Sequence, residues 1–315
     1  MILKPRFEST ELQLLRFLHS RAKLSDKDAN QYFRLEKGYE GETKFDEWLK
    51  DLSDDWIVLN DLLFEINNTV FQIDSTLLSN EGTYLFEVKN YDDDYYIENE
   101  QWYSKSGKEI TNPLHQLDRS ETQFRRLLQE LGYNPSKMQI KSYVVFVNHN
   151  FYLYQAPLNL PIIFPTQINR FMDKLNMKPT SKPRDSLTKL ANQLLSKQLK
   201  ESPYIRLLDY KYEQLRKGII CGSCQSIFSD SQTLSRLIVC SKCGCMENID
   251  AAVLRSVEEY KLLFPERKIT TNSIQEWCKI IKSKKTIRRI LSTNFIPQGH
   301  GNATYYIHSK NSPSM

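Results

Sequence analysis

Two stretches of the sequence decide the fold: Thr69-Val-Phe-Gln-Ile-Asp74 and Gly82-Thr-Tyr-Leu-Phe-Glu87-Val-Lys89. Each is rich in β-branched and aromatic residues, which is typical of a strand, and a turn sequence separates them. Side chains alternate between the two faces of a strand, so Glu87 and Lys89 are expected on the same face. A short turn would also bring Asp74 close to Glu87.

This pairing of acidic and basic side chains suits phosphodiester hydrolysis. Asp74 and Glu87 offer the carboxylate oxygens that Mg²⁺ or Mn²⁺ needs, leaving water and phosphate oxygens to complete the shell. Such an ion activates a bound water and offsets charge on the phosphoryl group, where Lys89 adds a positive charge. A surface salt bridge would leave the same pattern, so the neighbouring sequence has to decide.

The flanking sequence predicts helices around this sheet. Further strands are expected at Trp56–Leu59 and Tyr143–Val147, and a long helix at Leu114–Leu131. A separate helical face at Phe45–Leu52 precedes the strands, and Glu42, just ahead of it, could reach the same cation. The order helix, three strands, helix, strand predicts an α/β fold with a mixed sheet flanked by helices.

Several ordered motifs between roughly residues 10 and 176 resemble the nuclease-related domain (NERD) family, a relative of the PD-(D/E)xK nucleases. They are Lys37-Gly-Tyr-Glu-Gly-Glu42, Phe71-Gln-Ile-Asp74, Gly82-Thr-Tyr-Leu-Phe-Glu-Val-Lys-Asn90, Gln101-Trp102 and Asn112-Pro-Leu-His-Gln116. The resemblance implies a restriction-endonuclease-like core with these site residues: metal ligands Asp74 and Glu87, the catalytic lysine Lys89, and supporting residues Glu42 and Gln116. The family usually has His after the motif aspartate, where this chain has Ser75, which puts any role of that His in doubt.

Five of the six cysteines lie within residues 221–245. Two Cys-x2-Cys pairs, fifteen residues apart, can supply four thiolates to one tetrahedral ion, which predicts a structural Zn²⁺ ribbon on Cys221, Cys224, Cys240 and Cys243. Cys245 could replace Cys243, and we retain Cys243 for its spacing. Cys278 is expected to pack in a helical core, not to bind metal.

The C-terminal part of the chain is basic. Residues 211–315 carry 16 Lys and Arg against 8 Asp and Glu, or +8, which leaves −3 for residues 1–210. Such an excess favours a polyanionic partner. Three expected helices and a hairpin have the order of a winged helix-turn-helix, whose third helix enters the major groove. The residues expected to bind nucleic acid are Lys279, Lys282, Lys284, Lys285, Arg288 and Arg289.

A chain of 315 residues has room for several domains. We expect an N-terminal helical segment (1–36), a nuclease-related domain (37–177), a linker with a helix (178–211), a zinc ribbon (212–249) and a winged-helix-like domain (250–310). The N-terminus lacks a secretory signal, and no apolar run is long enough to span a bilayer. The sequence therefore predicts a cytoplasmic protein without a membrane partner.

These features together predict a metal-dependent, nuclease-like protein that hydrolyses phosphodiester bonds of DNA and is tethered by its C-terminal zinc ribbon and helix-turn-helix. Double-stranded DNA is the expected partner, and RNA is the alternative polymer, because cationic surfaces do not distinguish the two backbones. A different class of function also fits: a non-catalytic DNA-binding or regulatory protein with a degenerate nuclease core.

Overall fold

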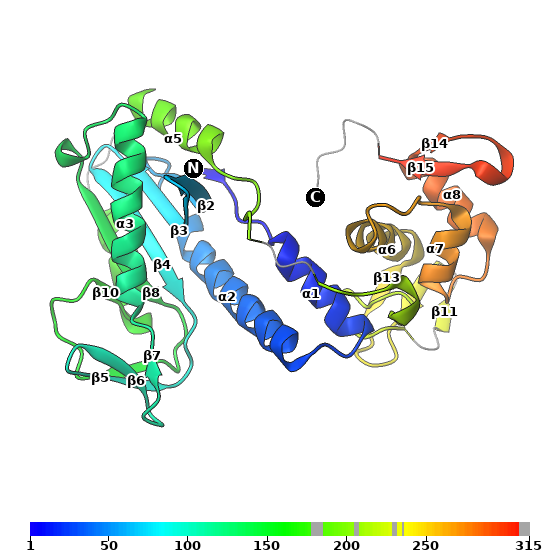
Figure 1. The fold of residues 1–315 in the computed structure, drawn as a ribbon, viewed down its shortest axis with the longest axis horizontal. Coiled ribbons are helices and arrows are strands. Elements are labelled where there is room, and N and C mark those ends of the chain that lie inside the picture. The colour runs from blue at the N-terminus through cyan, green and yellow to red at the C-terminus, as the bar shows by residue number, and fades with distance from the viewer. Residues whose placement is uncertain (178–184, 205–207, 229–231, 235, 309–315) are drawn as a thin grey trace. The chain divides into compact units, whose positions relative to one another are not determined.

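The structure divides into two compact units (Figure 1). Met1–Ser9 and Phe33–Ile205 form the first unit, and Thr10–Tyr32 and Arg206–Met315 form the second. Within the predicted linker (178–211), residues 178–184 and 205–207 lie outside the described residues. The computed structural model describes residues 1–177, 185–204, 208–228, 232–234 and 236–308.

A mixed six-stranded sheet, ordered β1-β2-β3-β4-β8-β10, is the centre of the first unit. Strands β2, β3 and β4 are antiparallel, whereas β1, β8 and β10 each run parallel to a neighbour. The predicted strands overlap β2, β3, β4 and β8. The bounds are β1 (Ile2–Lys4), β2 (Ile57–Ile66), β3 (Thr69–Ser79), β4 (Gly82–Lys89), β8 (Ile140–Phe146) and β10 (Ile162–Ile163).

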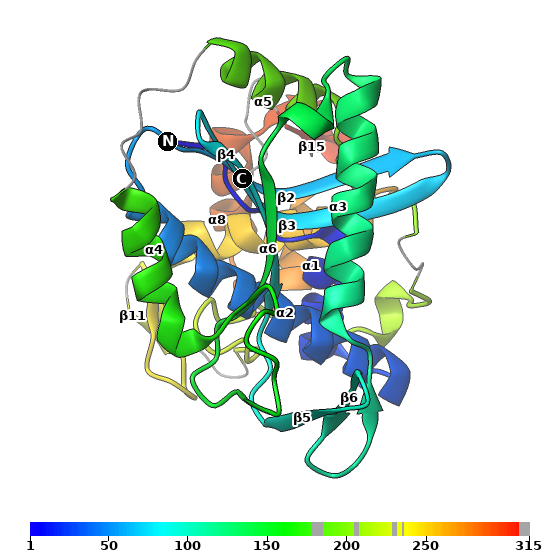
Figure 2. The same ribbon diagram turned by 90° about the vertical axis from the view of Figure 1, so that its left-hand side faces the viewer.

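Helices cover both faces of this sheet (Figure 2). Helices α2 (Asp26–Lys50) and α4 (Ile168–Asn176) pack on one face, and α3 (Pro113–Glu130) and α5 (Asp185–Lys197) on the other. Side chains along β4 alternate between the two faces of the sheet, so Phe86 packs against the α2 side and Leu85 against the α3 side. The predicted α/β fold, a mixed sheet flanked by helices, is confirmed.

Two features of the first unit differ from expectation. Residues 26–50 form the single helix α2, whereas the sequence predicted two helices with a change near Gly41, because glycine lowers helix propensity. A second, four-stranded sheet, ordered β7-β6-β5-β9, was not predicted, because its strands are only two to five residues long. They are β5 (Asp94–Glu98), β6 (Gln101–Ser104), β7 (Glu109–Ile110) and β9 (Tyr152–Tyr154).

The second unit combines helices with short antiparallel strands. Its described helices are α1 (Thr10–Arg21), α6 (Ile249–Leu263), α7 (Thr271–Cys278) and α8 (Lys284–Asn294). Its strands are β11 (Gln232–Leu234), β12 (Leu237–Val239) and β13 (Met246–Asn248) in one sheet, and β14 (Ile296–Gln298) and β15 (Tyr305–Ile307) in a hairpin. Three helices followed by a hairpin is the predicted order, and the winged-helix assignment stays a prediction.

A buried ion pair joins α1 to the core of the second unit. The Arg21 guanidinium donates to both carboxylate oxygens of Glu259, at 2.5 and 2.7 Å, and lies over the ring of Trp277. It also donates to the backbone carbonyls of Arg216 and Gly218. Both charged side chains are at most 3% exposed, so each needs the other to offset the cost of burial.

Gly41 lets α2 approach the end of β4. A Cβ atom at this position would lie 2.5 Å from the Cβ of Asn90, far inside van der Waals contact. Asn90 has little room to move, because its Nδ2 donates to the Lys37 carbonyl and its Oδ1 accepts from Asn148. The missing side chain at Gly41 therefore fixes how closely Glu42, the next residue, lies to the sheet.

Gly41→Ala should destabilise the first unit, although alanine normally stabilises a helix. Overpacking costs about 1–3 kcal/mol, which outweighs the gain of up to about 1 kcal/mol in helix propensity. Gly38→Ala is the matched control, since a Cβ there meets nothing within 4 Å in the same helix. Urea unfolding of both variants measures the difference, and equal stability for the two would contradict the packing argument.

Candidate functional site

Asp74 lies where strands β3 and β4 separate. Their pairing runs from Ser79 opposite Gly82 to Ser75 opposite Phe86. Beyond that point the Val88 N–H donates to the side chain of Asp74, at 2.7 Å, in place of a backbone carbonyl. The aspartate is 7% exposed, so this fork holds a buried carboxylate against the strand that carries Glu87 and Lys89.

Glu87 and Lys89 lie on the α3 side of β4. The Lys89 ammonium donates to the Glu87 carboxylate at 2.7 Å and to the side-chain oxygen of Gln116, on α3, at 3.0 Å. Two acceptors from different elements therefore orient the lysine. Gln116 is exposed, whereas Glu87 is 3% exposed, so the lysine connects a buried carboxylate to the surface.

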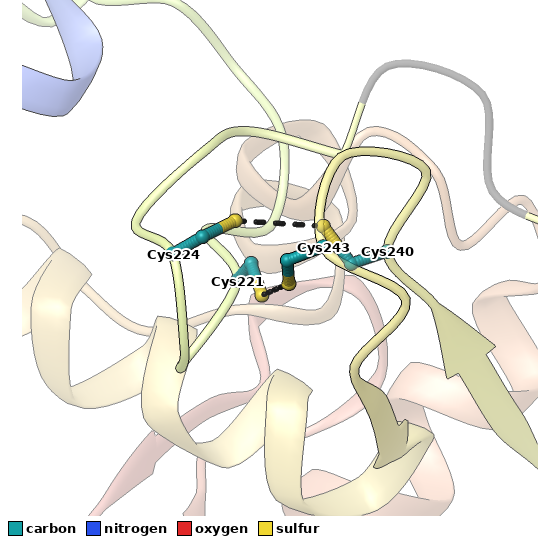
Figure 3. A group of neighbouring side chains, drawn as sticks. All are labelled: Cys221, Cys224, Cys240 and Cys243. Carbon is teal, nitrogen blue, oxygen red and sulfur yellow. Dashed lines mark hydrogen bonds between the residues drawn. The ribbon is translucent and has the colours of Figure 1, made fainter.

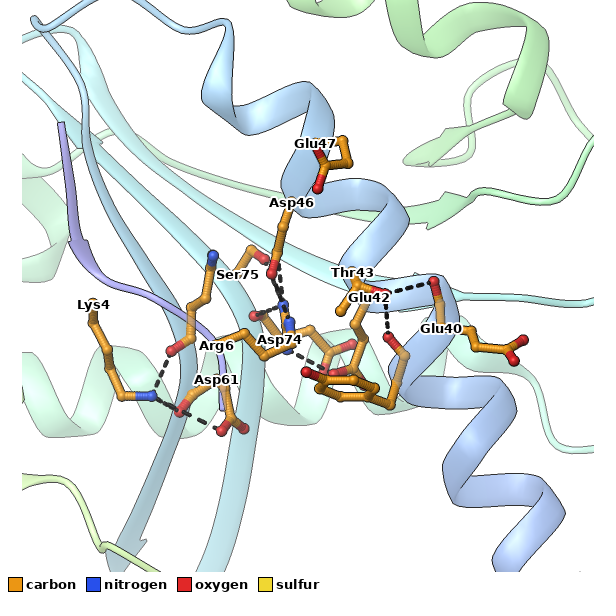
Figure 4. A network of polar contacts seen from close by, with 12 residues as sticks. Lys4, Arg6, Glu40, Glu42, Thr43, Asp46, Glu47, Asp61, Asp74 and Ser75 are labelled. Carbon is orange, nitrogen blue, oxygen red and sulfur yellow. Dashed lines mark hydrogen bonds and ion pairs between the residues drawn. The ribbon is translucent and has the colours of Figure 1, made fainter. Parts of the chain in front are cut away.

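Glu42 reaches the same region from α2 and is held by an arginine from the N-terminal segment (Figure 4). Arg6 donates to Glu42 at 2.6 Å and makes a two-pronged contact with Asp46, one helical turn further along α2. The same guanidinium donates to the backbone carbonyl of Asp74 and to the hydroxyl of Ser75. Ser75 stands at the position where the related family usually has His.

The carboxyl groups are close enough to disturb one another. Burial and the nearby charge of Asp74 raise the pKa of Glu42 to about 8. The same two causes raise the pKa of Glu87 to about 8. Burial also raises the pKa of Asp74, against the opposing charge of Lys89. Without a cation, these groups favour the folded state most at low pH, and that contribution is lost as the pH rises through about 8.

The five residues expected in the nuclease-like site are thus brought to one region. Sequence reasoning missed Arg6, whose signal was indirect: Glu42 and Asp46 are acids one turn apart on a helix face that also buries Phe45. It also missed Asp61, which lies between the Asn60–Ser75 and Leu62–Ile73 pairs of β2 and β3 with φ +56°, and whose charge acts on Glu42 and Asp74. The sequence around Asp61 contains no comparable pattern.

The donor set fits a hard divalent cation. Carboxylate oxygens are the ligands that Mg²⁺ and Mn²⁺ prefer. Burial and the charge of Asp74 raise the pKa values of Glu42 and Glu87, and a bound cation would offset both effects. The carboxylates are not drawn together around one point, however. In the part of the chain that the structure describes, the one group of potential metal ligands whose atoms all lie within 4.8 Å of one another consists of cysteines.

Four cysteines converge to form a candidate metal centre (Figure 3). They are Cys221, Cys224, Cys240 and Cys243, and their sulfur atoms lie within 4.8 Å of one another. Two sulfur pairs are 3.6 and 3.7 Å apart. Zinc–sulfur bonds of about 2.3 Å give a tetrahedron with edges of about 3.8 Å, so the cluster has the size of a structural site for an ion such as Zn²⁺.

The other two cysteines lie outside this cluster. Cys245 is partly exposed, and its backbone carbonyl accepts from the Cys240 N–H in the turn of the second pair. Cys278 is fully buried in the helical core of the second unit. The arrangement favours Cys243 over Cys245 as the fourth ligand and agrees with a packing role for Cys278.

The six basic residues expected to bind nucleic acid are all exposed. Ile287, Ile290 and Leu291 of α8 are buried, so the charged residues occupy the opposite side of the helix. Arg289 donates to both carboxylate oxygens of Asp250, which neutralises part of its charge. The exposed residues are Lys279, Lys282, Lys284, Lys285, Arg288 and Arg289.

Substitutions in the cysteine cluster should separate the fourth ligand from the spare thiol. Cys243→Ser should lower the bound zinc from one atom per chain and lower the melting temperature of the second unit, because a structural ion stabilises only the folded form. Cys245→Ser is the matched control and should retain zinc. Elemental analysis of the purified variants gives the metal content, and the reverse result would assign Cys245 as the ligand.

Comparison with known proteins gives one match. The family model of the nuclease-related domain matches residues 37–147, a range that contains the five site residues of the first unit. The chain matches no curated protein and no solved structure. None of the described helices has the length and apolar character to cross a membrane. Residues 37–147, which include most of the mixed sheet and all five site residues, are therefore similar to a nuclease-related domain.

Proposed function

We propose that the first unit is a divalent-metal-dependent nuclease that hydrolyses phosphodiester bonds, with double-stranded DNA as its substrate. The observation that carries the proposal is that Asp74 lies close enough to Glu42 and Glu87 for its charge to raise the pKa of both. The ammonium of Lys89 lies beside them, 2.7 Å from Glu87. Phosphodiester cleavage requires stabilisation of negative charge on the phosphoryl group and an activated water, and carboxylates beside a fixed cation are suited to both.

Each residue has a distinct role in this proposal. Asp74 and Glu87 would hold Mg²⁺ or Mn²⁺, with Glu42 as a further oxygen donor, and the ion would lower the pKa of the attacking water. Lys89 would place its charge beside the scissile phosphate. The nearby carboxylates raise the pKa of Lys89 in spite of its burial, so it stays protonated and acts as a fixed charge. Gln116 would keep it in position.

The second unit is proposed to bind the same DNA. Its exposed cations at Lys279, Lys282, Lys284, Lys285 and Arg288 support contacts with backbone phosphates, and Arg289 contributes less because Asp250 already pairs with it. The third helix of the expected winged helix, α8, would enter the major groove. The cysteine cluster would stabilise this unit without taking part in the chemistry, because four thiolates leave no open position.

One observation favours the alternative function of a non-catalytic DNA-binding protein. Lys89 lies 2.7 Å from Glu87 and Arg6 lies 2.6 Å from Glu42, so two of the three carboxylates already have an internal cation. A core that had lost its metal could persist as such a salt-bridged scaffold. Cleavage, not binding, is therefore the property that separates the two functions.

Glu87→Gln should reduce DNA cleavage on the order of 100-fold or more, as expected for loss of a group that stabilises the transition state. Binding to duplex DNA should change little. The measurement is nicking of supercoiled DNA by the full chain with Mg²⁺ or Mn²⁺, with RNA as a second substrate. The exposed Glu65→Gln in β2 is the matched control. Binding without cleavage by every form, including the wild type, would favour the non-catalytic function.

Lys284→Ala combined with Lys285→Ala should weaken DNA binding equally across sequences. Each lost phosphate contact removes about 0.9 from the slope of log affinity against log salt, so two contacts remove about 1.8. Lys23→Ala combined with Lys27→Ala removes the same charge from exposed positions elsewhere in the second unit. Binding titrations at several salt concentrations compare the pairs, and an unchanged slope for the α8 pair would rule out its phosphate contacts.

A further inference from the structure

Arg6 is the most completely engaged side chain near the candidate nuclease site. Its side chain is 2% exposed, and it makes five hydrogen bonds at 2.6 to 3.1 Å. Lys4, two residues earlier, donates to the carbonyls of Asn60 and Asp61 and so anchors the strand from which Arg6 extends. Arg6 also lies outside residues 37–147, the part that matches the nuclease-related family model.

The partners of Arg6 include two residues of the candidate site, Glu42 and Asp74, and one acid outside it, Asp46. From α2 it holds one oxygen of Glu42 and both oxygens of Asp46. From β3 it holds the backbone of Asp74 and the hydroxyl of Ser75. One planar group therefore fixes the distance between the helix that carries Glu42 and the strand that carries Asp74 (Figure 4).

The shape of the guanidinium matters as much as its charge. A lysine could supply one positive charge to Glu42 or Asp46, but its ammonium could not span both carboxylates and the Asp74 carbonyl in a fixed plane. Because Arg6 is buried, it has no surface from which to contact a substrate phosphate. Its effect on chemistry must be exerted through the residues that it holds.

We propose that Arg6 is a positioning residue that orients Glu42 and Asp74 toward the divalent cation of the nuclease site. The inference rests on the proposed function. Arg6 holds one oxygen of Glu42 and the backbone carbonyl of Asp74, and so fixes the helix that carries one carboxylate against the strand that carries the other. Its neighbour Ser75 provides a hydroxyl acceptor where the related family usually has His.

The test is Mn²⁺ binding to the full chain, measured by calorimetry, together with DNA cleavage. Arg6→Lys keeps the positive charge but loses the planar guanidinium and its several donors. It should weaken Mn²⁺ binding about tenfold or more, as for other groups that orient metal ligands. Asp46→Asn is the matched control, since it removes part of the same cluster and leaves the bonds from Arg6 to Glu42 and Asp74 possible. It should lower the melting temperature and leave Mn²⁺ affinity close to that of the wild type, because Asp46 is not proposed to orient a metal ligand.

A double-variant cycle and a measurement on the wild type complete the design. Because Arg6 acts partly through Glu42, Arg6→Lys should lower Mn²⁺ affinity less in a Glu42→Gln background than in the wild type, and equal losses in the two backgrounds would contradict this route. In the wild-type chain, Mg²⁺ should shift the side-chain Nε resonance of Arg6 and leave that of Arg21, the buried arginine of the second unit, unchanged. This measurement does not depend on the folding of any variant.

The outcomes distinguish the inference from the proposed function. If the wild type binds Mn²⁺ and cuts DNA, and Arg6→Lys does so equally well, the positioning role is wrong and the nuclease remains. If Arg6→Lys and Asp46→Asn lose affinity in proportion to their loss of stability, Arg6 is a structural clamp only. If the wild type neither binds Mn²⁺ nor cuts, and Glu87→Gln behaves identically, both the proposed function and the inference fail.

Discussion

The hydrogen bond from the Val88 N–H to the Asp74 carboxylate sets the geometry of the first unit around its site. A backbone N–H buried at a point where two strands separate needs an acceptor, and leaving it without one would cost about 1–3 kcal/mol. Asp74 supplies that acceptor and thereby becomes a buried carboxylate between β3 and β4. Since Glu87 and Lys89 flank Val88 in β4, the same hydrogen bond also fixes the backbone positions from which their side chains extend.

The charges around this fork do not balance, and this distinguishes them from a structural ion pair. When all are ionised, four carboxylates and two cations leave a net charge of −2, the groups being Glu42, Asp46, Asp74, Glu87, Arg6 and Lys89. In the second unit, Arg21 meets one carboxylate, Glu259, and its other donors go to backbone carbonyls. That pair needs no further ion, whereas a divalent cation would neutralise the excess at the fork.

The sequence predicted those parts of the structure whose causes are local. Alternating apolar residues identified β3 and β4, and the spacing of four cysteines identified a cluster that packs at tetrahedral distances. It failed where the cause lies far along the chain. Gly41 lies inside helix α2 because a side chain there would collide with Asn90, and the partners of Arg6 lie 36 to 69 residues away from it in the sequence. Neither fact can be read from a window of neighbouring residues.

The two N-terminal segments make the family match a poor guide to where the folded units begin. Met1–Ser9 belongs to the first unit and contributes Arg6, whereas Thr10–Tyr32 belongs to the second and contributes Arg21. Both arginines are buried and paired, and both precede residue 37, where the match begins. A fragment cut there would leave Glu42 and Asp46 without their guanidinium and would leave Glu259 as an unpaired buried charge, which costs about 3–5 kcal/mol. The chain therefore has to be studied whole, because each unit depends on a residue supplied from outside its own main segment.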